Sequence, residues 1–267
     1  MRQDTQPSLG QASATASVVC LHASASSSRQ WRPLQRQLAA SHQMLVPDLY
    51  GSGDSPQWTG DRALTLADEV ALLEPVLQAA GRPFCLVGHS YGGAVALRAA
   101  LSDPGRIQSL VLIEPVMFSL LVADDPDQPA AREIIAVRDG ADAAVARGAL
   151  DRAAERFIDY WMGLGTLAAM PPARRAAAAE AMRDVRHEWS ALFAETTPLA
   201  AYAALDMPTL FLAGSQSPAS ARRVTALLAA TLPRATVTEL DGAGHMSPVT
   251  HPGLVNAAVQ AHLARHR

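Results

Sequence analysis

Residues 83–101 read PFCLVGHSYGGAVALRAAL: an apolar run, a turn of small residues around a serine, and a second apolar run with helical spacing. The first run predicts a buried strand and the last predicts a helix. Between them, the Gly-x-Ser-x-Gly pattern predicts a tight strand-to-helix turn, in which Gly88, Gly92 and Gly93 leave room for the backbone. Such a turn holds the Ser90 hydroxyl beside the amino end of the helix. Ser90 is therefore a candidate nucleophile.

The same alternation of short strand and longer helix extends along most of the chain. This alternation is typical of a parallel sheet with crossover helices. We predict strands at residues 17–22, 43–48, 83–89, 107–114, 208–214 and 235–240. We predict helices near residues 29–40, 65–80, 90–102, 219–231 and 250–265. The fold class that follows is α/β.

One long segment, residues 116–205, interrupts the alternation. It is rich in Ala and Arg, has no convincing strand, and predicts helices near residues 129–147, 149–162 and 172–194. A helical insertion between two strands of a regular alternation is most simply a cap over the carboxyl ends of the sheet. We therefore expect residues 17–115 and 206–267 to form the core, and residues 1–16 to form a polar prefix.

The composition is that of a globular protein without a surface for polyanions. Apolar residues make up 49% of the 267 residues and charged residues 18%, and the net charge is −3. All 22 basic side chains are Arg and they are scattered, which argues against binding of nucleic acid or an anionic membrane. No apolar run approaches the roughly 20 residues of a membrane span. The prefix lacks the apolar core of a secretory signal, and Cys20 and Cys85 lie in apolar runs typical of buried thiols, so we expect a cytoplasmic protein.

Four motifs follow one another in an order that is familiar from a known family. They are VVCLHASASSSRQW (18–31), DLYGSGDS (48–55), GHSYGG (88–93) and DGAGHMSP (241–248). With them the chain resembles the α/β-hydrolase family from about residue 17 onward, although Ala23 stands where the family usually has glycine. The resemblance implies a mostly parallel sheet of about six strands, lacking the first one or two of the usual eight. It also implies helices on both faces of the sheet and a helical cap.

The resemblance assigns roles to single residues. It places the nucleophile at Ser90 and the two backbone N–H groups of the oxyanion hole at Ser24 and Tyr91. Such donors stabilise the tetrahedral oxyanion of acyl transfer. His245 is the only histidine in a glycine-flanked loop after the last predicted strand, and we expect it to be the general base. His22 is interpreted as a structural residue.

In the family, an acidic side chain completes a catalytic triad with the serine and the histidine. The candidate for this acid lies in the stretch SLVLIEPVMF, residues 109–118. A carboxylate at the end of a buried apolar run is costly unless it has a partner. In much of the family the acid follows the later strand, but this sequence has Ser217 there and no carboxylate between Asp206 and Glu239. The family's other position for the acid, the end of the preceding strand, falls on Glu114. The alternative is that Glu114 pairs with an Arg or with backbone near the cap.

The expected function is that of an esterase-like serine hydrolase. It would cleave a carboxylic ester, thioester or lactone of a small to medium, fairly apolar substrate through an acyl-enzyme. Two alternatives stay open: a hydrolase of C–C bonds of the meta-cleavage-product type, and a ligand-binding relative with little turnover. The expected partner is a small-molecule substrate, and a homodimer is left open. No metal-ligand spacing or dinucleotide fingerprint is present, so we expect no metal and no cofactor.

The cap and the histidine loop are expected to supply the wall of the substrate pocket. The residues that we predict for this wall are Met117, Phe118, Tyr160, Trp161, Trp189 and Met246.

Overall fold

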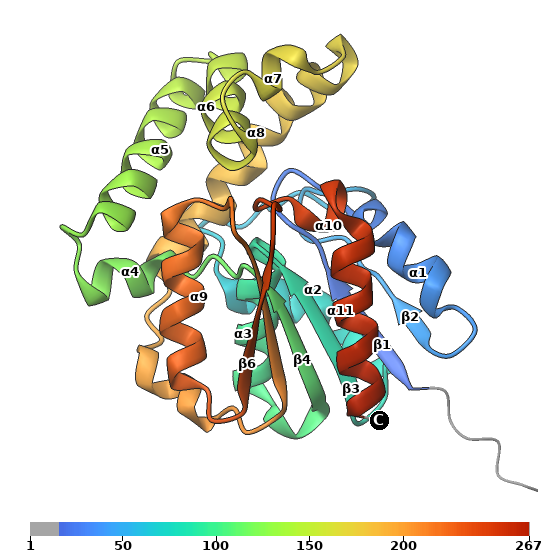
Figure 1. Ribbon diagram of the computed structural model, residues 1–267. Coiled ribbons are helices and arrows are strands. Elements are labelled where there is room, and N and C mark those ends of the chain that lie inside the picture. The colour runs from blue at the N-terminus through green and yellow to red at the C-terminus, as the bar shows by residue number, and fades with distance from the viewer. Residues whose placement is uncertain (1–15, 267) are drawn as a thin grey trace, which may run out of the picture.

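A six-stranded parallel sheet forms the centre of the computed structural model, which describes residues 16–266 (Figure 1). The strand order is β2-β1-β3-β4-β5-β6, and every neighbouring pair is parallel. The strands are β1 (Ser17–Leu21), β2 (Gln43–Leu45), β3 (Phe84–His89), β4 (Ile107–Ile113), β5 (Thr209–Gly214) and β6 (Ala235–Leu240). The α/β sheet of about six strands that the sequence predicts is thereby confirmed.

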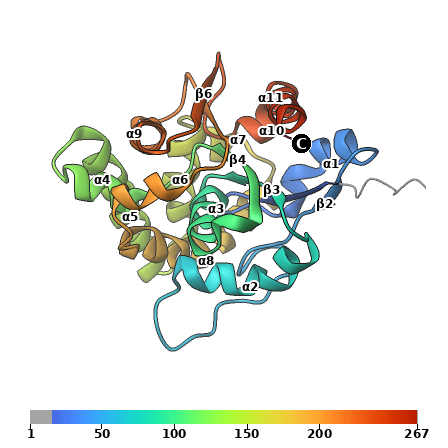
Figure 2. The same cartoon turned by 90° about the horizontal axis from the view of Figure 1, so that it is seen from below.

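Helices cover both faces of the sheet, as the unbroken apolar runs of its central strands require. The helices of the core are α1 (Arg32–Leu38), α2 (Leu66–Ala79), α3 (Tyr91–Ser102), α9 (Ala219–Thr231), α10 (Ser247–Thr250) and α11 (Pro252–Arg265). Alternate residues of β1 show the two layers: Val19 packs in one cluster with α2 and α3, and Val18 packs in a second cluster with α1 and α11. Figure 2 shows these layers from below, on opposite sides of the strands.

A helical segment connects β4 to β5. It consists of α4 (Phe118–Asp124), α5 (Pro129–Ala146), α6 (Leu150–Met162), α7 (Thr166–Ala169) and α8 (Pro172–Ala194). Helices α5 to α8 stand together at one end of the molecule, beyond the carboxyl ends of the strands (Figure 1). The bounds of α8, α9 and β6 are those predicted from the sequence, whereas α4 was not predicted. The expected polar prefix, residues 1–16, lies almost wholly outside the described residues.

The two cysteines lie on neighbouring strands. Cys20 on β1 and Cys85 on β3 are both buried, and both are free thiols. The Ser109 hydroxyl donates to the sulfur of Cys85 at 3.3 Å. Burial raises the pKa of both thiols, so they pack as small apolar side chains rather than as reactive groups.

Two carboxyl groups are buried between α8 and the core. Glu69 on α2 is 0% exposed; it accepts hydrogen bonds from the Tyr91 hydroxyl at 3.0 Å and from the Tyr50 amide at 3.2 Å. Glu188 on α8 is 1% exposed, and its Oε2 has no hydrogen-bond partner among the described residues. Burial raises the pKa of Glu188 from 4.5 to about 8, a hydrogen bond from Ser24 acts against the shift, and the charge of Glu69 adds to it. Glu188 is therefore protonated at neutral pH.

Glu188→Gln should make the stability of the protein less dependent on pH. The native state holds the Glu188 proton more tightly than the unfolded chain does, so the free energy of unfolding falls as the pH rises from about 4.5 to about 8. The loss is at most about 1.4 kcal/mol for each pH unit in that window. Denaturant unfolding at pH 5 to 9 should show a shallower decline for Glu188→Gln than for the wild type.

Glu180→Gln is the matched control, because Glu180 is an exposed carboxylate on the same helix. It should follow the wild-type profile. Parallel pH profiles for the wild type and Glu188→Gln would mean that Glu188 is already ionised in the native state at neutral pH.

Candidate active site

Ser90 lies in the tight turn between β3 and α3, with a backbone conformation that few side chains adopt. Its φ is +55° and its ψ is −118°. The turn brings backbone groups so close that a side chain would not fit: a Cβ on Gly88 would lie 2.5 Å from the carbonyl oxygen of Gly92. A hydrogen bond of 3.0 Å from the Ser90 amide to the carbonyl of Ile113 ties the turn to β4. The strain is therefore held by the sheet, and the Ser90 side chain has a fixed position.

Glu114 directly follows β4 and has a similarly strained conformation, with a φ of +45°. Its side chain is 0% exposed. The amide of Gly214, at the end of β5, donates to Oε1 at 2.6 Å, and the imidazole Nδ1 of His245 lies 2.6 Å from Oε2. Both carboxylate oxygens are therefore hydrogen-bonded, and these bonds offset the free-energy cost of removing the group from water.

His245 lies in the loop after β6 and connects Glu114 to Ser90. Because Nδ1 donates to the carboxylate, Nε2 is the acceptor nitrogen of the neutral ring, and it lies 2.9 Å from the Ser90 hydroxyl oxygen. The imidazole is 2% exposed. His89 anchors the loop, since its Nε2 donates to the carbonyl oxygen of His245 at 2.9 Å. Burial lowers the pKa of His89 well below its usual value, so this ring stays neutral.

An indole ring covers the face of the His245 imidazole. The ring centroids of Trp161 and His245 are 4.0 Å apart, and the planes are inclined by 28°, which is a stacked arrangement. Trp161 belongs to α6, and the neighbouring Tyr160 fixes this helix to the core through a 2.7 Å hydrogen bond between its hydroxyl and that of Ser220. The stack therefore sets the electron-rich face of the indole against the imidazole ring.

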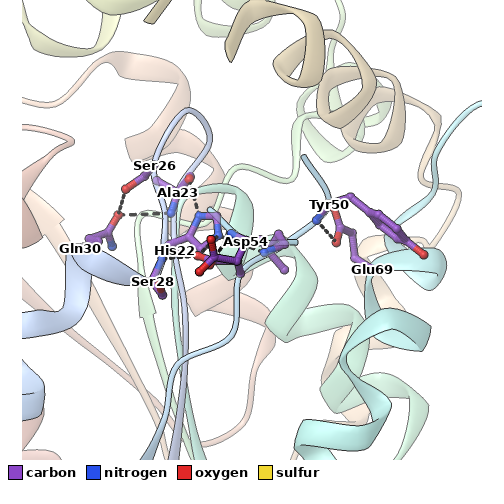
Figure 3. Close-up of polar contacts among 10 residues, drawn as sticks. His22, Ala23, Ser26, Ser28, Gln30, Tyr50, Asp54 and Glu69 are labelled. Carbon is purple, nitrogen blue, oxygen red and sulfur yellow. Dashed lines mark hydrogen bonds and ion pairs between the residues drawn. The ribbon is translucent and has the colours of Figure 1, made fainter. Parts of the chain in front are cut away.

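The side chains of His22 and Gln30, which lie before and after the loop that follows β1, hold this loop through polar contacts (Figure 3). The Nδ1 of His22 donates to the carbonyl of Ala23 at 2.8 Å, while its Nε2 accepts from the amide of Leu49 at 3.1 Å. Gln30 accepts from the amide of Ala23 at 3.3 Å and from the hydroxyl of Ser26 at 3.2 Å. Burial lowers the pKa of His22, so it remains the neutral ring that these two contacts need.

Two backbone amides at the candidate site have no hydrogen-bond acceptor among residues 16–266. One belongs to Ser24, in the loop after β1, and the other to Tyr91, the first residue of α3. The two segments meet at this point, because the Gly92 amide donates to the carbonyl of His22 at 3.1 Å. Both free donors are thus held on elements that contact one another beside Ser90.

A cavity of about 340 Å³ opens over Ser90 and His245. It is mostly apolar, and it is lined by Ala23, Ser24, Ala25, Ser26, Ser90, Phe157, Ile158, Trp161, Met162, Met170, Arg174, Ala177, Ala178, His245, Met246 and Val249. Of the predicted wall residues, Trp161 and Met246 line this cavity. Tyr160 lines an adjacent cavity of about 470 Å³ that shares Trp161, Met246 and His245 with the first.

Three predicted wall residues lie elsewhere. Met117, Phe118 and Trp189 do not line the cavity over Ser90; they are at most 2% exposed and pack in the core. Phe118 packs against the ring of Phe193, and Trp189 against that of Phe157, with centroid distances of 5.5 Å and 5.9 Å. They bury apolar surface between helices instead of facing a substrate.

Several residues at the site were not predicted from the sequence. Gln30 tethers the loop after β1; it lies within the motif of residues 18–31, but no role was predicted for it. Phe157, one turn before Trp161 on α6, shares its cavity-facing side, and Met170 lies between α7 and α8. Helical spacing from Trp161 could have identified Phe157. Among the described residues, no group of three or more His, Cys, Asp or Glu side chains is placed to hold a metal ion, and no helix is long and apolar enough to cross a membrane.

Known proteins resemble this chain in sequence and in fold. The lipase LipV of Mycobacterium tuberculosis is 35% identical over 106 residues, which are 39% of this chain and 39% of LipV. The chain matches about a quarter to two-fifths of the length of these curated relatives.

Two solved structures match nearly the whole chain. A thermophilic esterase from Thermogutta terrifontis has a TM-score of 0.73 at 25% identity, with 94% of this chain and 91% of the esterase covered. A hydrolase from Pseudomonas aeruginosa has the same TM-score at 26% identity, with 94% and 91% covered. The family model described as "Alpha/beta hydrolase family" matches residues 18–258. The chain therefore belongs to the alpha/beta hydrolase family.

Proposed function

We propose that the protein is a serine hydrolase that cleaves a carboxylic ester, thioester or lactone of a small to medium, mostly apolar substrate. The observation that carries this proposal is the continuous hydrogen-bonded series from the Glu114 carboxylate through His245 to the Ser90 hydroxyl, at the floor of an apolar cavity. The names of similar proteins, a lipase and an esterase, support the same class of reaction.

Acylation begins at the hydroxyl of Ser90. Its oxygen attacks the carbonyl carbon while its proton passes to Nε2 of His245, and the carbonyl oxygen becomes the oxyanion of a tetrahedral intermediate. We assign the amides of Ser24 and Tyr91 as the donors to that oxyanion, and losing one such donor typically costs about 3–4 kcal/mol in the barrier. The His245 proton then moves to the leaving alcohol, and the acyl-enzyme remains. Water, deprotonated by the same imidazole, releases the acid and restores Ser90.

Two neighbours support the charged imidazole that forms during each half-reaction. Glu114 accepts from Nδ1 of His245, so it fixes the tautomer in which Nε2 faces Ser90 and stabilises the cation. The face of Trp161 adds a second favourable contact with that cation. Because the indole comes from α6, the helical segment between β4 and β5 takes part in the site, and we propose that residues 116–205 act as a cap.

The site needs only a small-molecule substrate and water, and we propose that the protein works without a cofactor. Its two free thiols, on Cys20 and Cys85, support a reducing compartment, and we propose the cytoplasm as its location.

Ser90→Ala and His245→Ala should each lower kcat for a 4-nitrophenyl ester by about 10⁴-fold or more, because the nucleophile and its base act as one unit. The residual rate would come from the oxyanion donors and the cavity. Ser90→Ala removes no core packing, so its denaturant midpoint should stay near that of the wild type. His245→Ala leaves the buried Glu114 carboxylate without one hydrogen-bond partner, so its midpoint should be lower. A fluorophosphonate should label the wild type on Ser90, and labelling of Ser90→Ala to the same extent would refute the assignment of the nucleophile.

Glu114→Gln should lower kcat by about 10²–10³-fold. The Gln oxygen can still accept from Gly214, but its NH₂ group would then face Nδ1 of His245, where two donors meet. The imidazole is forced into the other tautomer, whose Nε2 carries a proton and cannot accept one from Ser90. Steady-state kinetics with the same ester measures the loss. Full activity in Glu114→Gln would reduce Glu114 to a structural role.

Ser217 supplies the control for the position of the acid. It follows β5, where the family often carries the carboxylate, and its hydroxyl is buried without a partner among the described residues. We expect Ser217→Asp to recover part of the lost kcat in the Glu114→Gln background and to change little in the wild type. No recovery would mean that an acid after β5 cannot reach His245 in this chain.

The cavity predicts a limit on acyl length. For 4-nitrophenyl esters from acetate upward, kcat/KM should rise by up to about fourfold per methylene while each buried CH₂ contributes about 0.8 kcal/mol, and then fall when the cavity is full. Ala178→Leu, on the cavity wall, should move the optimum to shorter chains. Ala176→Leu, on the exposed side of the same helix, should leave the optimum where it is. A flat profile would show that the acyl chain lies outside this cavity.

A further inference from the structure

The cavity over Ser90 contains one permanently charged side chain, that of Arg174. The rest of its lining is apolar or uncharged, apart from the imidazole of His245, and no carboxylate lines it. A single cation in an otherwise apolar cavity is a recognition feature, because such cavities fix the orientation of a ligand through a few polar groups. The proposed reaction does not use Arg174.

Arg174 belongs to the exposed part of the cavity lining, whereas the candidate nucleophile is buried. Ser90 is 5% exposed and lies at the floor, whereas Arg174 is an exposed residue in the first turn of α8. Ala177 and Ala178 follow three and four residues later, share the helix face of Arg174, and line the same cavity. The part of α8 that follows Arg174 therefore contributes small side chains to the cavity wall.

The guanidinium of Arg174 has no hydrogen bond or ion pair with any residue in the range 16–266. Neighbouring arginines on α8 differ in this respect. Arg175 donates to the carbonyls of Ala168 and Met170 at 3.1 Å and 3.2 Å, and Arg183 pairs with Glu180 at 3.3 Å. A guanidinium presents five donors in a rigid fork that matches a carboxylate. Arg174 therefore has its donors available to a ligand that emerges from the cavity.

We propose that the substrate is an amphipathic ester whose apolar chain fills the cavity and whose far end carries a carboxylate, bound by Arg174. This inference rests on the proposed ester hydrolysis and names its substrate class. The carboxylate takes no part in bond making or breaking: water still splits the ester, and the anion sets the orientation of the chain. Arg174 is thus a specificity residue, and its contribution belongs to substrate binding.

The test compares pairs of substrates that differ only in charge at the far end. Methyl hydrogen adipate, suberate and sebacate are each paired with the methyl ester of the corresponding ω-carboxamide. In at least one pair the wild type should prefer the carboxylate by about three- to tenfold in kcat/KM, mainly through KM, as expected for one partly exposed ion pair. The preference should shrink as salt is raised from 20 mM to 500 mM, since salt screens exposed charges.

Variants of Arg174 identify the source of the preference. Arg174→Gln should bring the carboxylate-to-carboxamide ratio of kcat/KM close to one, and Arg174→Lys should keep part of the preference. Arg183→Gln removes the same charge from the same helix at a residue that does not line this cavity, and it should keep the wild-type ratio. An unchanged ratio in Arg174→Gln, or an equal loss in Arg183→Gln, would overturn the proposal.

Binding to Ser90→Ala separates this inference from the proposed function. Calorimetry with the intact methyl esters measures Kd without turnover, and the carboxylate should bind more tightly than the carboxamide by the same factor. If the wild type hydrolyses none of the esters and this difference in Kd still depends on Arg174, the anion site stands and the ester function fails. If neutral esters are hydrolysed and no charge preference exists in Kd or kcat/KM, the anion site fails and the ester function stands.

Discussion

The buried carboxylate of Glu114 constrains the whole carboxyl edge of the sheet. A group that is 0% exposed at a strand end must have both oxygens satisfied, and its partners come from two later segments, the end of β5 and the loop after β6. Gly214 and His245 are 100 and 131 residues away in sequence, so these hydrogen bonds form only when the strand order β3-β4-β5-β6 is complete. The same contacts that satisfy the carboxylate position the imidazole beside Ser90. Correct folding of the sheet and assembly of the site are therefore one event.

Three buried histidines at this edge have different chemistry because their partners differ. His22 donates to a carbonyl and accepts from an amide, which requires a neutral ring; His89 donates to the carbonyl of His245. Burial lowers the pKa of both, so they remain fixed, uncharged links between loops. His245 alone of the three contacts a carboxylate at hydrogen-bond distance and a hydroxyl. Its surroundings favour proton transfer, whereas those of the other two favour a rigid backbone.

Features that depend on a short stretch of sequence were predicted correctly, such as the turn between β3 and α3. The apolar run followed by GHSYGG predicted the turn at Ser90 because only small residues fit where a Cβ would meet backbone at 2.5 Å. The interruption of an apolar strand predicted that Glu114 needs a partner, but its assignment as the acid came from the resemblance to the family, which carries that group at one of two positions. The surroundings of the helical segments were harder to predict. Periodicity shows which face of a helix is buried, but it does not show whether that face meets another helix or a cavity. Met117, Phe118 and Trp189 were therefore placed on the pocket wall by composition, although they pack between helices.

Helix α8 contacts both the cavity and the loop that carries Ser24. Its 23 residues carry Arg174 in the exposed part of the cavity lining, Ala177 and Ala178 along the wall, and Glu188 beside Ser24. A helix of this length spans about 34 Å. Glu188 can remain buried without a cationic partner only while it keeps its proton, and in that form it holds α8 against the loop that carries Ser24. The wall that would select the substrate and the contact with the loop that carries Ser24 are thus parts of one helix.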